Sequence, residues 1–232
     1  MVILRISVLM LVSKELNLRR DQFLPIVSTF QLALFGPLAW WVHAHPVLPI
    51  DVKISHAIQK KQSSLLDYGS LALDFVGTYK LLTPLAMPIA LVLWMLRLRL
   101  EAVMLAGISL SSFLLRTVLQ HLVNRPRPSP LLVRVKKKAH SKSFPSGHVI
   151  ASLSFWGWLF SLGMMSSKGM RPWQKATLTI PALIIVLVGP SRIYLGDHWA
   201  SDVLGGYLLG GGLLGLSLRL YLKLRRKGVL AH

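Results

Sequence analysis

Three short polar segments, residues 125–128, 145–148 and 191–202, bring histidine, arginine, serine and aspartate into an otherwise apolar sequence. Histidine can act as a nucleophile or as a general acid or base near neutral pH. An arginine guanidinium can hold phosphate oxygens with two parallel N–H donors. If the chain folds so that the three segments meet, these residue types indicate a site for transfer or hydrolysis of a phosphoryl group.

The third segment contains a histidine and a carboxylate at helical spacing. His198 and Asp202 are four residues apart, so within a helix they share one face. A carboxylate in that position can hold the Nδ1–H of the ring and leave Nε2 free as a nucleophile or base; alternatively, it only caps the helix. We interpret Asp197 as a helix N-cap rather than a catalytic group, and Ser191 as either a phosphate contact or a packing residue.

The other segments supply groups that bind anions. Ser146, Gly147 and His148 precede an apolar stretch, and the free N–H groups at a helix start are suited to binding phosphate. Arg127 and Arg192 can each grip phosphate oxygens. No set of histidine, cysteine and carboxylate residues suggests zinc, and so much fixed positive charge makes a divalent metal unnecessary. We therefore predict a site without metal or cofactor.

The composition places these segments in a membrane protein. Of the 232 residues, 53% are apolar and only 15% are charged, whereas soluble domains have roughly 45–50% and about 25%. The chain is too hydrophobic to be disordered, and the absence of cysteine excludes a disulfide scaffold. A nucleic-acid partner is not expected, because the net charge of +19 accompanies long apolar blocks rather than a polar surface.

Six apolar stretches predict an all-α, polytopic bundle of six transmembrane helices in one domain. They cover roughly residues 23–42, 70–96, 102–123, 149–165, 176–193 and 200–222. We interpret residues 1–22 as an interfacial N-terminal segment and residues 43–69 as a polar connection. The chain between His148 and Arg192 is long enough for two spans, so the three polar segments are expected to return to the same face of the membrane.

The charges of the loops give a weak indication of orientation. Lys and Arg are almost equally divided between the two sides, but most of those on the site's side lie in residues 125–142 and 191–202. If these two segments are set aside, both termini are expected in the cytoplasm and the site on the extracytoplasmic face of the cell membrane. We interpret the lysines at 136–138 as an attractor of headgroups or phosphate. Arg116, inside the third span, is expected to pair with Asp74, to extend towards the interface or to contact substrate.

The motifs resemble those of the type 2 phosphatidic acid phosphatase (PAP2) family of membrane lipid phosphatases, which is related to vanadium haloperoxidases. The family signature is K-x6-R-P, followed by P-S-G-H and then S-R-x5-H-x3-D. The second and third parts are complete here, at residues 145–148 and 191–202. The resemblance covers about residues 70–222, which we take as the core of the domain.

The resemblance implies a role for each matching position. His198 would attack phosphorus to form a phosphohistidine, Asp202 would orient and polarise it, and His148 would protonate the leaving oxygen and then activate water. The resemblance also implies that four positions hold the phosphate oxygens: Arg127, Ser146, Gly147 and Arg192. A highly anionic transition state requires this combination of positioning and positive charge.

One position departs from the family signature. The first part ends in Arg127 and Pro128 as expected, but Gln120 stands where the family has lysine. Either this phosphate contact is neutral, or another cation replaces the lysine. Arg125 and the lysines at 136–138 are the candidates. The departure is expected to affect the rate or the substrate more than the type of reaction.

The function expected from this resemblance is hydrolysis of a lipid phosphate or diphosphate. Polyprenyl diphosphate, such as undecaprenyl diphosphate, is the first candidate, followed by phosphatidic acid and phosphatidylglycerol phosphate. Two alternatives remain open: a phosphotransferase that passes phosphate to a lipid or sugar hydroxyl, and a lipid-phosphate-binding transporter or scaffold with weakened catalysis. The expected partners are the lipid substrate and the surrounding membrane lipids.

Overall fold

The structure is a computed structural model that describes residues 2–136, 141–166 and 170–230, with side chains from residue 23 onward. Within these residues it contains helices and no strands, as predicted. Five apolar helical stretches in the described chain are long enough to cross a membrane, and a bent helix pair makes a sixth. The predicted six-span bundle is therefore confirmed.

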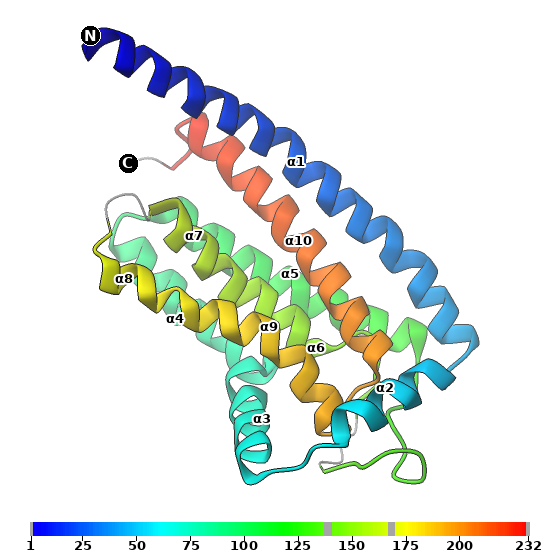
Figure 1. The fold of residues 1–232 in the computed structure, drawn as a ribbon. Coiled ribbons are helices and arrows are strands. Elements are labelled where there is room, and N and C mark those ends of the chain that lie inside the picture. The colour runs from blue at the N-terminus through cyan, green and yellow to red at the C-terminus, as the bar shows by residue number, and fades with distance from the viewer. Residues whose placement is uncertain (1, 137–140, 167–169, 231–232) are drawn as a thin grey trace.

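The two longest helices, α1 (Val2–Ala44) and α10 (Ala200–Arg226), run antiparallel along one side of the bundle (Figure 1). Glycines on α10 allow their close approach, since a Cβ at Gly215 would collide with Ser28 of α1. Helix α1 continues without a break from residue 2 into the first span, so the predicted N-terminal segment is part of this helix and not a separate element.

The region predicted as a polar connection between the first two spans is mostly helical. It forms α2 (Pro49–Gln59) and the first turns of α3 (Ser64–Gly77), which begins where the Ser63 hydroxyl accepts the Leu66 N–H at 3.2 Å. Helix α2 buries polar residues, including Asp51 and Gln59, so a search for apolar stretches passes over it. The second span then bends by 47° between α3 and α4 (Tyr79–Met95).

The remaining spans follow the predicted order. Helix α5 (Arg99–Val123) ends at Asn124, which adopts a left-handed conformation. The fourth span joins α6 (Gly147–Ser152), a π-helical turn η1 (Leu153–Gly157) and α7 (Trp158–Ser166). The fifth span joins α8 (Pro172–Thr177) and α9 (Thr179–Tyr194). Trp158 is fully buried at the centre of the bundle and packs edge-on against Tyr221 of α10.

The two ends of the bundle are formed by different helix ends. The start of α1, the end of α7, the start of α8 and the end of α10 lie at one end, whereas α2, the end of α5 and the starts of α6 and α10 gather at the other (Figure 1). The three polar segments of the sequence analysis are attached to these latter elements. The topology therefore brings them to one end of the molecule, as their spacing predicts.

Candidate active site

Two histidines from different helices face each other at this end of the bundle. The rings of His148, at the start of α6, and His198, just before α10, are 6.5 Å apart between centroids and approach edge to face. His198 is completely buried, and His148 is only slightly exposed. They form the centre around which the arginines and carboxylates are arranged.

The nucleophile candidate His198 lies between a carboxylate and an arginine. Its Nδ1 is 3.6 Å from Asp202 Oδ2, slightly longer than a hydrogen bond, and its Nε2 is 3.4 Å from Arg127 Nη1. Such contacts often tighten when substrate binds. Helix α10 begins only at Ala200, so His198 precedes the helix, and the predicted shared helix face is wrong. Asp202 instead reaches back over the helix start, where it also accepts the Trp199 N–H at 2.8 Å.

Asp202 is fully buried and held by several donors. It accepts hydrogen bonds from Ser143 Oγ and from Arg125 Nη1, the latter at 2.6 Å. Arg125 also pairs with Asp51 of α2 at 2.7 Å and is 99% buried. Arg125 therefore supports the carboxylate behind His198 and does not replace the missing lysine. Sequence reasoning missed Asp51 and Ser143, because neither stands in a recognisable local pattern.

Arg127 is fixed beside His198 by several acceptors. Its Nη1 donates to the Asp197 carboxylate and to the Asp197 carbonyl, both at 2.6 Å, and its Nε donates to the Ser141 carbonyl at 2.8 Å. Asp197 thus pairs with Arg127, whereas Trp199 occupies the N-cap of α10, so the interpretation of Asp197 as the cap is wrong. The pairing leaves Arg127 facing the reactive nitrogen of His198.

Burial and charge set the ionisation states of the two residues before α10. Burial, reinforced by the charge of Arg127, lowers the pKa of His198, so its ring is neutral at neutral pH. Burial alone would raise the pKa of Asp197, but its charged neighbours, among them Arg127, outweigh burial and lower that pKa. Asp197 is therefore an ionised carboxylate, and His198 is a neutral imidazole whose Nε2 faces Arg127 Nη1.

The acid–base candidate His148 contacts Asp74, a carboxylate that the sequence analysis did not assign to the site. Its Nε2 lies 3.0 Å from Asp74 of α3, and Arg192 of α9 pairs with the same carboxylate. Arg192 also donates to the Ser70 carbonyl at 3.0 Å. Arg116, which was expected to pair with Asp74, to extend towards the interface or to contact substrate, has its guanidinium over the Tyr79 ring, 3.7 Å from the centroid. The sequence contained a signal for the role of Asp74, since a carboxylate inside an apolar span is expensive and often functional.

The remaining predicted site residues surround the two histidines in different ways. Ser146 Oγ is buried at the start of α6 without a hydrogen-bond partner among the described residues, so it is free to bind a phosphate oxygen. Ser191 Oγ donates to the Val188 carbonyl at 2.7 Å and accepts from Arg192, which favours a packing role. Gln120 Nε2 donates to the Pro145 carbonyl at 3.3 Å and so supports the loop before α6.

In the part of the chain that the structure describes, the segment with the lysines at 136–138 brings no positive charge to the two histidines. Lys136 pairs with Asp67 of α3, which also accepts a hydrogen bond from Tyr194. The lysines at 137 and 138 lie outside the described residues. Of the predicted replacements for the motif lysine, neither Arg125 nor Lys136 is available to phosphate.

The site could in principle attract either a cation or an anion. Ligand atoms of His148, Asp197 and His198 lie within 4.8 Å of one another, a geometry that can hold a metal ion. However, Asp197 is already paired with Arg127, and Arg192 adds a second guanidinium to the site. Two guanidinium groups therefore lie beside these ligand atoms, an arrangement that can also hold an anion such as phosphate.

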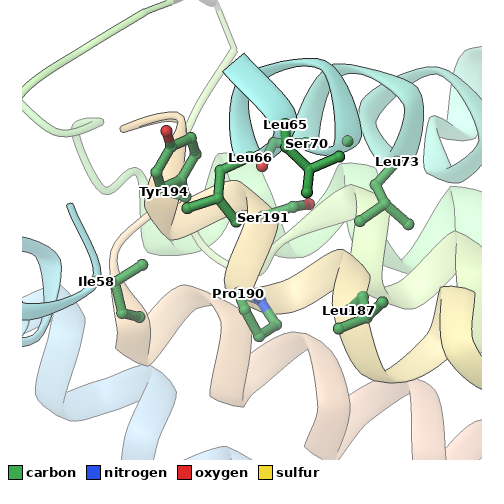
Figure 2. Close-up of a pocket in the computed structure, with 10 residues that line it drawn as sticks. Ile58, Leu65, Leu66, Ser70, Leu73, Leu187, Pro190, Ser191 and Tyr194 are labelled. Carbon is green, nitrogen blue, oxygen red and sulfur yellow. The ribbon is translucent and has the colours of Figure 1, made fainter. Parts of the chain in front are cut away.

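An apolar cavity of about 290 Å³ lies next to this site, between α3 and α9 (Figure 2). Its walls include Leu66 and Leu73 of α3 and Leu187 of α9. Ser70 and Ser191 also line it, and both are hydrogen-bonded to Arg192. Ser70 and Ser191 therefore lie between the apolar wall of the cavity and Arg192, a candidate for phosphate binding.

The helical bundle, the paired histidines and the surrounding arginines define a class of membrane proteins that act on phosphate groups. The family model of the PAP2 superfamily matches residues 100–226, which is more than half of the chain. The chain belongs to the PAP2 superfamily, whose characterised relatives found here are lipid phosphatases.

Two curated relatives and one solved structure show how far this similarity extends. Phosphatidylglycerophosphatase B of Bacillus subtilis (strain 168) is 30% identical over 186 residues, which cover 79% of this chain and 88% of the relative. The undecaprenyl-diphosphatase of Sulfolobus acidocaldarius is 33% identical over 87 residues, 37% of each chain. The crystal structure of a transmembrane PAP2-type phosphatidylglycerolphosphate phosphatase from Bacillus subtilis matches with a TM-score of 0.74 at 27% identity, covering 86% of this chain and 98% of that one.

Proposed function

We propose that this protein hydrolyses a lipid phosphate or diphosphate through a phosphohistidine intermediate. The observation that carries the proposal is the placement of neutral His198, with Nε2 3.4 Å from Arg127 and Nδ1 3.6 Å from Asp202, opposite His148. A nucleophile, an oriented carboxylate, an acid–base group and an anion-binding cation are the parts that such a reaction needs.

In the first step His198 Nε2 attacks phosphorus and the bond from phosphorus to the lipid oxygen breaks. His148 gives its proton to that leaving oxygen, and Asp202 stabilises the positive charge that develops on the His198 ring. In the second step His148 takes a proton from water, and the resulting hydroxide displaces His198 from phosphorus. Inorganic phosphate leaves, and both histidines return to their starting states.

Positive charge and N–H donors stabilise the transition state of both steps. Four groups are proposed to hold the three equatorial oxygens: the guanidinium groups of Arg127 and Arg192, Ser146 Oγ and the N–H of Gly147. These groups supply the electrostatic stabilisation that a metal ion supplies in other phosphatases, so the reaction is proposed to be metal-independent.

The apolar cavity between α3 and α9 is proposed to hold the lipid chain nearest the phosphate. The names of the relatives favour two substrates for testing, phosphatidylglycerol phosphate and undecaprenyl diphosphate. Leu73→Trp, which fills the cavity, is expected to raise KM for these long-chain substrates and to leave KM for a short-chain, water-soluble phosphate ester unchanged. Equal effects on both kinds of substrate would contradict the placement of the chain.

The decisive experiment measures phosphate release by purified protein from a panel of lipid phosphates in the presence of EDTA. His198→Ala is expected to reduce the rate by several orders of magnitude, whereas His121→Ala, at an exposed histidine near the end of α5, serves as the matched control. Wild-type protein denatured rapidly at alkaline pH, where a phosphohistidine is stable, should also carry labelled phosphate on His198. Binding of lipid phosphate without release would overturn the proposal and favour a transporter or scaffold.

The site is proposed to lie on the extracytoplasmic face of the cell membrane, with both termini in the cytoplasm. Basic residues within α1 before the first span, and near the C-terminal ends of α4 and α10, support this orientation, because they flank spans at the end opposite the site.

A further inference from the structure

The lysine of the family's first motif is replaced by Gln120, and the described cations that the sequence offered as substitutes are engaged elsewhere. Gln120 donates to the Pro145 carbonyl, and Arg125 pairs with Asp51 and Asp202. Arg116 lies one turn before Gln120 on α5 and therefore on the same helix face. We propose that Arg116 supplies the phosphate-facing positive charge that the family signature places at position 120. The assignment rests on the proposed phosphatase function.

The side chain of Arg116 reaches the start of α6, where the phosphate-binding N–H groups lie. A Cβ built on Gly147 would lie 2.8 Å from Arg116 Nη1 and 2.9 Å from its Cδ. Because glycine has no Cβ, there is room at Gly147 for the Arg116 guanidinium directly against the P-S-G-H motif. The next residue after this glycine is the acid–base candidate His148.

Aromatic rings hold the Arg116 guanidinium in this position. It lies over the Tyr79 ring, 3.7 Å from the centroid, and 5.7 Å from the centroid of Phe113. Arg116 is only 6% exposed, and its Nε has no hydrogen-bond partner in the described part of the chain. Stacking on two rings stabilises the orientation of the cation but does not neutralise its charge.

The charge of Arg116 is not matched by a carboxylate among the described residues. Each of the other site arginines has such a partner: Arg125 has Asp51 and Asp202, Arg127 has Asp197, and Arg192 has Asp74. The charge of Arg127 also acts on Arg116 as a repulsion. A phosphate bound between these two guanidinium groups would relieve this repulsion and compensate the buried charge.

The location of Arg116 also explains how the motif tolerates glutamine. A lysine at 120 and an arginine at 116 are neighbours on α5, so one cation can replace the other with little change in the position of the charge. The arginine is longer and planar, and it reaches the same loop from one turn further away. Gln120 then stabilises the loop before α6 through its hydrogen bond to the Pro145 carbonyl.

Exchanging the two side chains tests the assignment. Arg116→Gln is expected to raise KM for the lipid phosphate, and Ki for inorganic phosphate as competitive inhibitor, by about 10-fold or more, as for loss of a charge-assisted hydrogen bond. The double variant Arg116→Gln/Gln120→Lys restores a cation one turn later and should stay within about fivefold of wild type. Arg116→Lys retains the charge but loses the planar stacking group, so it should lose less than Arg116→Gln without matching wild type. Arg99→Gln is the matched control, because Arg99 lies at the opposite end of α5 and also stacks on an aromatic ring, that of Trp94.

Three outcomes would overturn the assignment. The first is an unchanged KM and phosphate Ki in Arg116→Gln. The second is a double variant that folds but binds no better than Arg116→Gln, because a purely structural arginine would not be rescued by a lysine at 120. The third applies even if Arg116→Gln does not fold: a tenfold rise of KM in both charge-retaining variants. If the wild-type protein releases no phosphate from any lipid, the proposed function fails instead, and calorimetric binding of inorganic phosphate to wild type and Arg116→Gln still tests the assignment.

Discussion

Asp74 connects the acid–base histidine with one of the arginines of the site. It lies within the second span, yet its carboxylate contacts both His148 and Arg192. A carboxylate in this position orients the acid–base histidine and stabilises its protonated form, while it also fixes an arginine that is proposed to hold phosphate. The acid–base group and the phosphate clamp thus depend on one side chain.

Removing the charge of Asp74 is expected to affect the chemical step. Asp74→Asn should lower kcat by about 100-fold or more, because His148 loses the partner that orients it and favours its protonation. Asp67→Asn is the matched control on the same helix, since Asp67 pairs with Lys136 and Tyr194 away from the histidines. Steady-state kinetics with both purified variants check the prediction, and comparable losses in the two would contradict it.

The pH dependence follows from the environment of His198. Burial and the charge of Arg127 lower the pKa of His198, and the ring must be neutral to attack. The acid limb of kcat/KM is therefore expected below the ordinary histidine value of about 6.5. Arg127→Gln removes one of the causes of the lowered pKa, so this limb should move to higher pH, in addition to any loss of phosphate binding.

A pH–rate profile of wild type and Arg127→Gln, recorded from about pH 4 to about pH 8, measures this shift. A limb that stays in place, or that moves to lower pH in the variant, would show that His198 is not the titrating group.

Among the helices, the crossing of α6 and α10 determines how the two halves of the site are aligned. Gly206 of α10 lies against the loop before α6, and a Cβ there would be 2.9 Å from Val149 Cβ and 3.1 Å from the Ser146 carbonyl oxygen. Backbone atoms cannot move aside as a flexible side chain can. This contact therefore holds the P-S-G-H segment, with His148, at a fixed distance from the start of α10, where His198 lies.

An added methyl group at this crossing should separate the two halves. Gly206→Ala is expected to destabilise the protein by about 1–3 kcal/mol and to lower kcat, since overpacking displaces α6 from α10. Gly107→Ala, in α5, is the control, because a Cβ at that glycine meets nothing within 4 Å. Thermal unfolding in detergent and kinetics measure both effects; a fully active, equally stable Gly206→Ala would contradict this account of the crossing.

The sequence predicts some of these elements better than others, for physical reasons. The six apolar spans and the convergence of the three motifs were predictable, because hydropathy and span length determine both. Helix α2 was missed because its buried face carries Asp51 and Gln59. A helix with polar residues on its buried face has the low hydropathy that is typical of a loop. The support of Asp202 by Arg125 and Asp51 could not be predicted, since it joins segments more than seventy residues apart.

For the whole molecule, the membrane topology divides the chain into a site end and a terminal end (Figure 1). Lys142 is exposed at the site end, and Lys175 is exposed at the other. The protein contains no cysteine, so single cysteines can be introduced without a background. In intact cells, Lys142→Cys should react with a membrane-impermeant thiol reagent, and Lys175→Cys should react only after permeabilisation. The reverse pattern would place the site in the cytoplasm.

The cavity beside Arg192 has a consequence for how the reaction rate should be expressed. Because the cavity is apolar and lies between two membrane helices, a lipid substrate would reach it by diffusion within the bilayer. Its occupancy would then depend on the number of substrate molecules per unit of membrane area and not on their amount per volume of solution. Diluting the substrate with inert lipid, at a constant total amount of substrate, should therefore slow turnover, so surface mole fraction is the natural measure of substrate concentration for this protein.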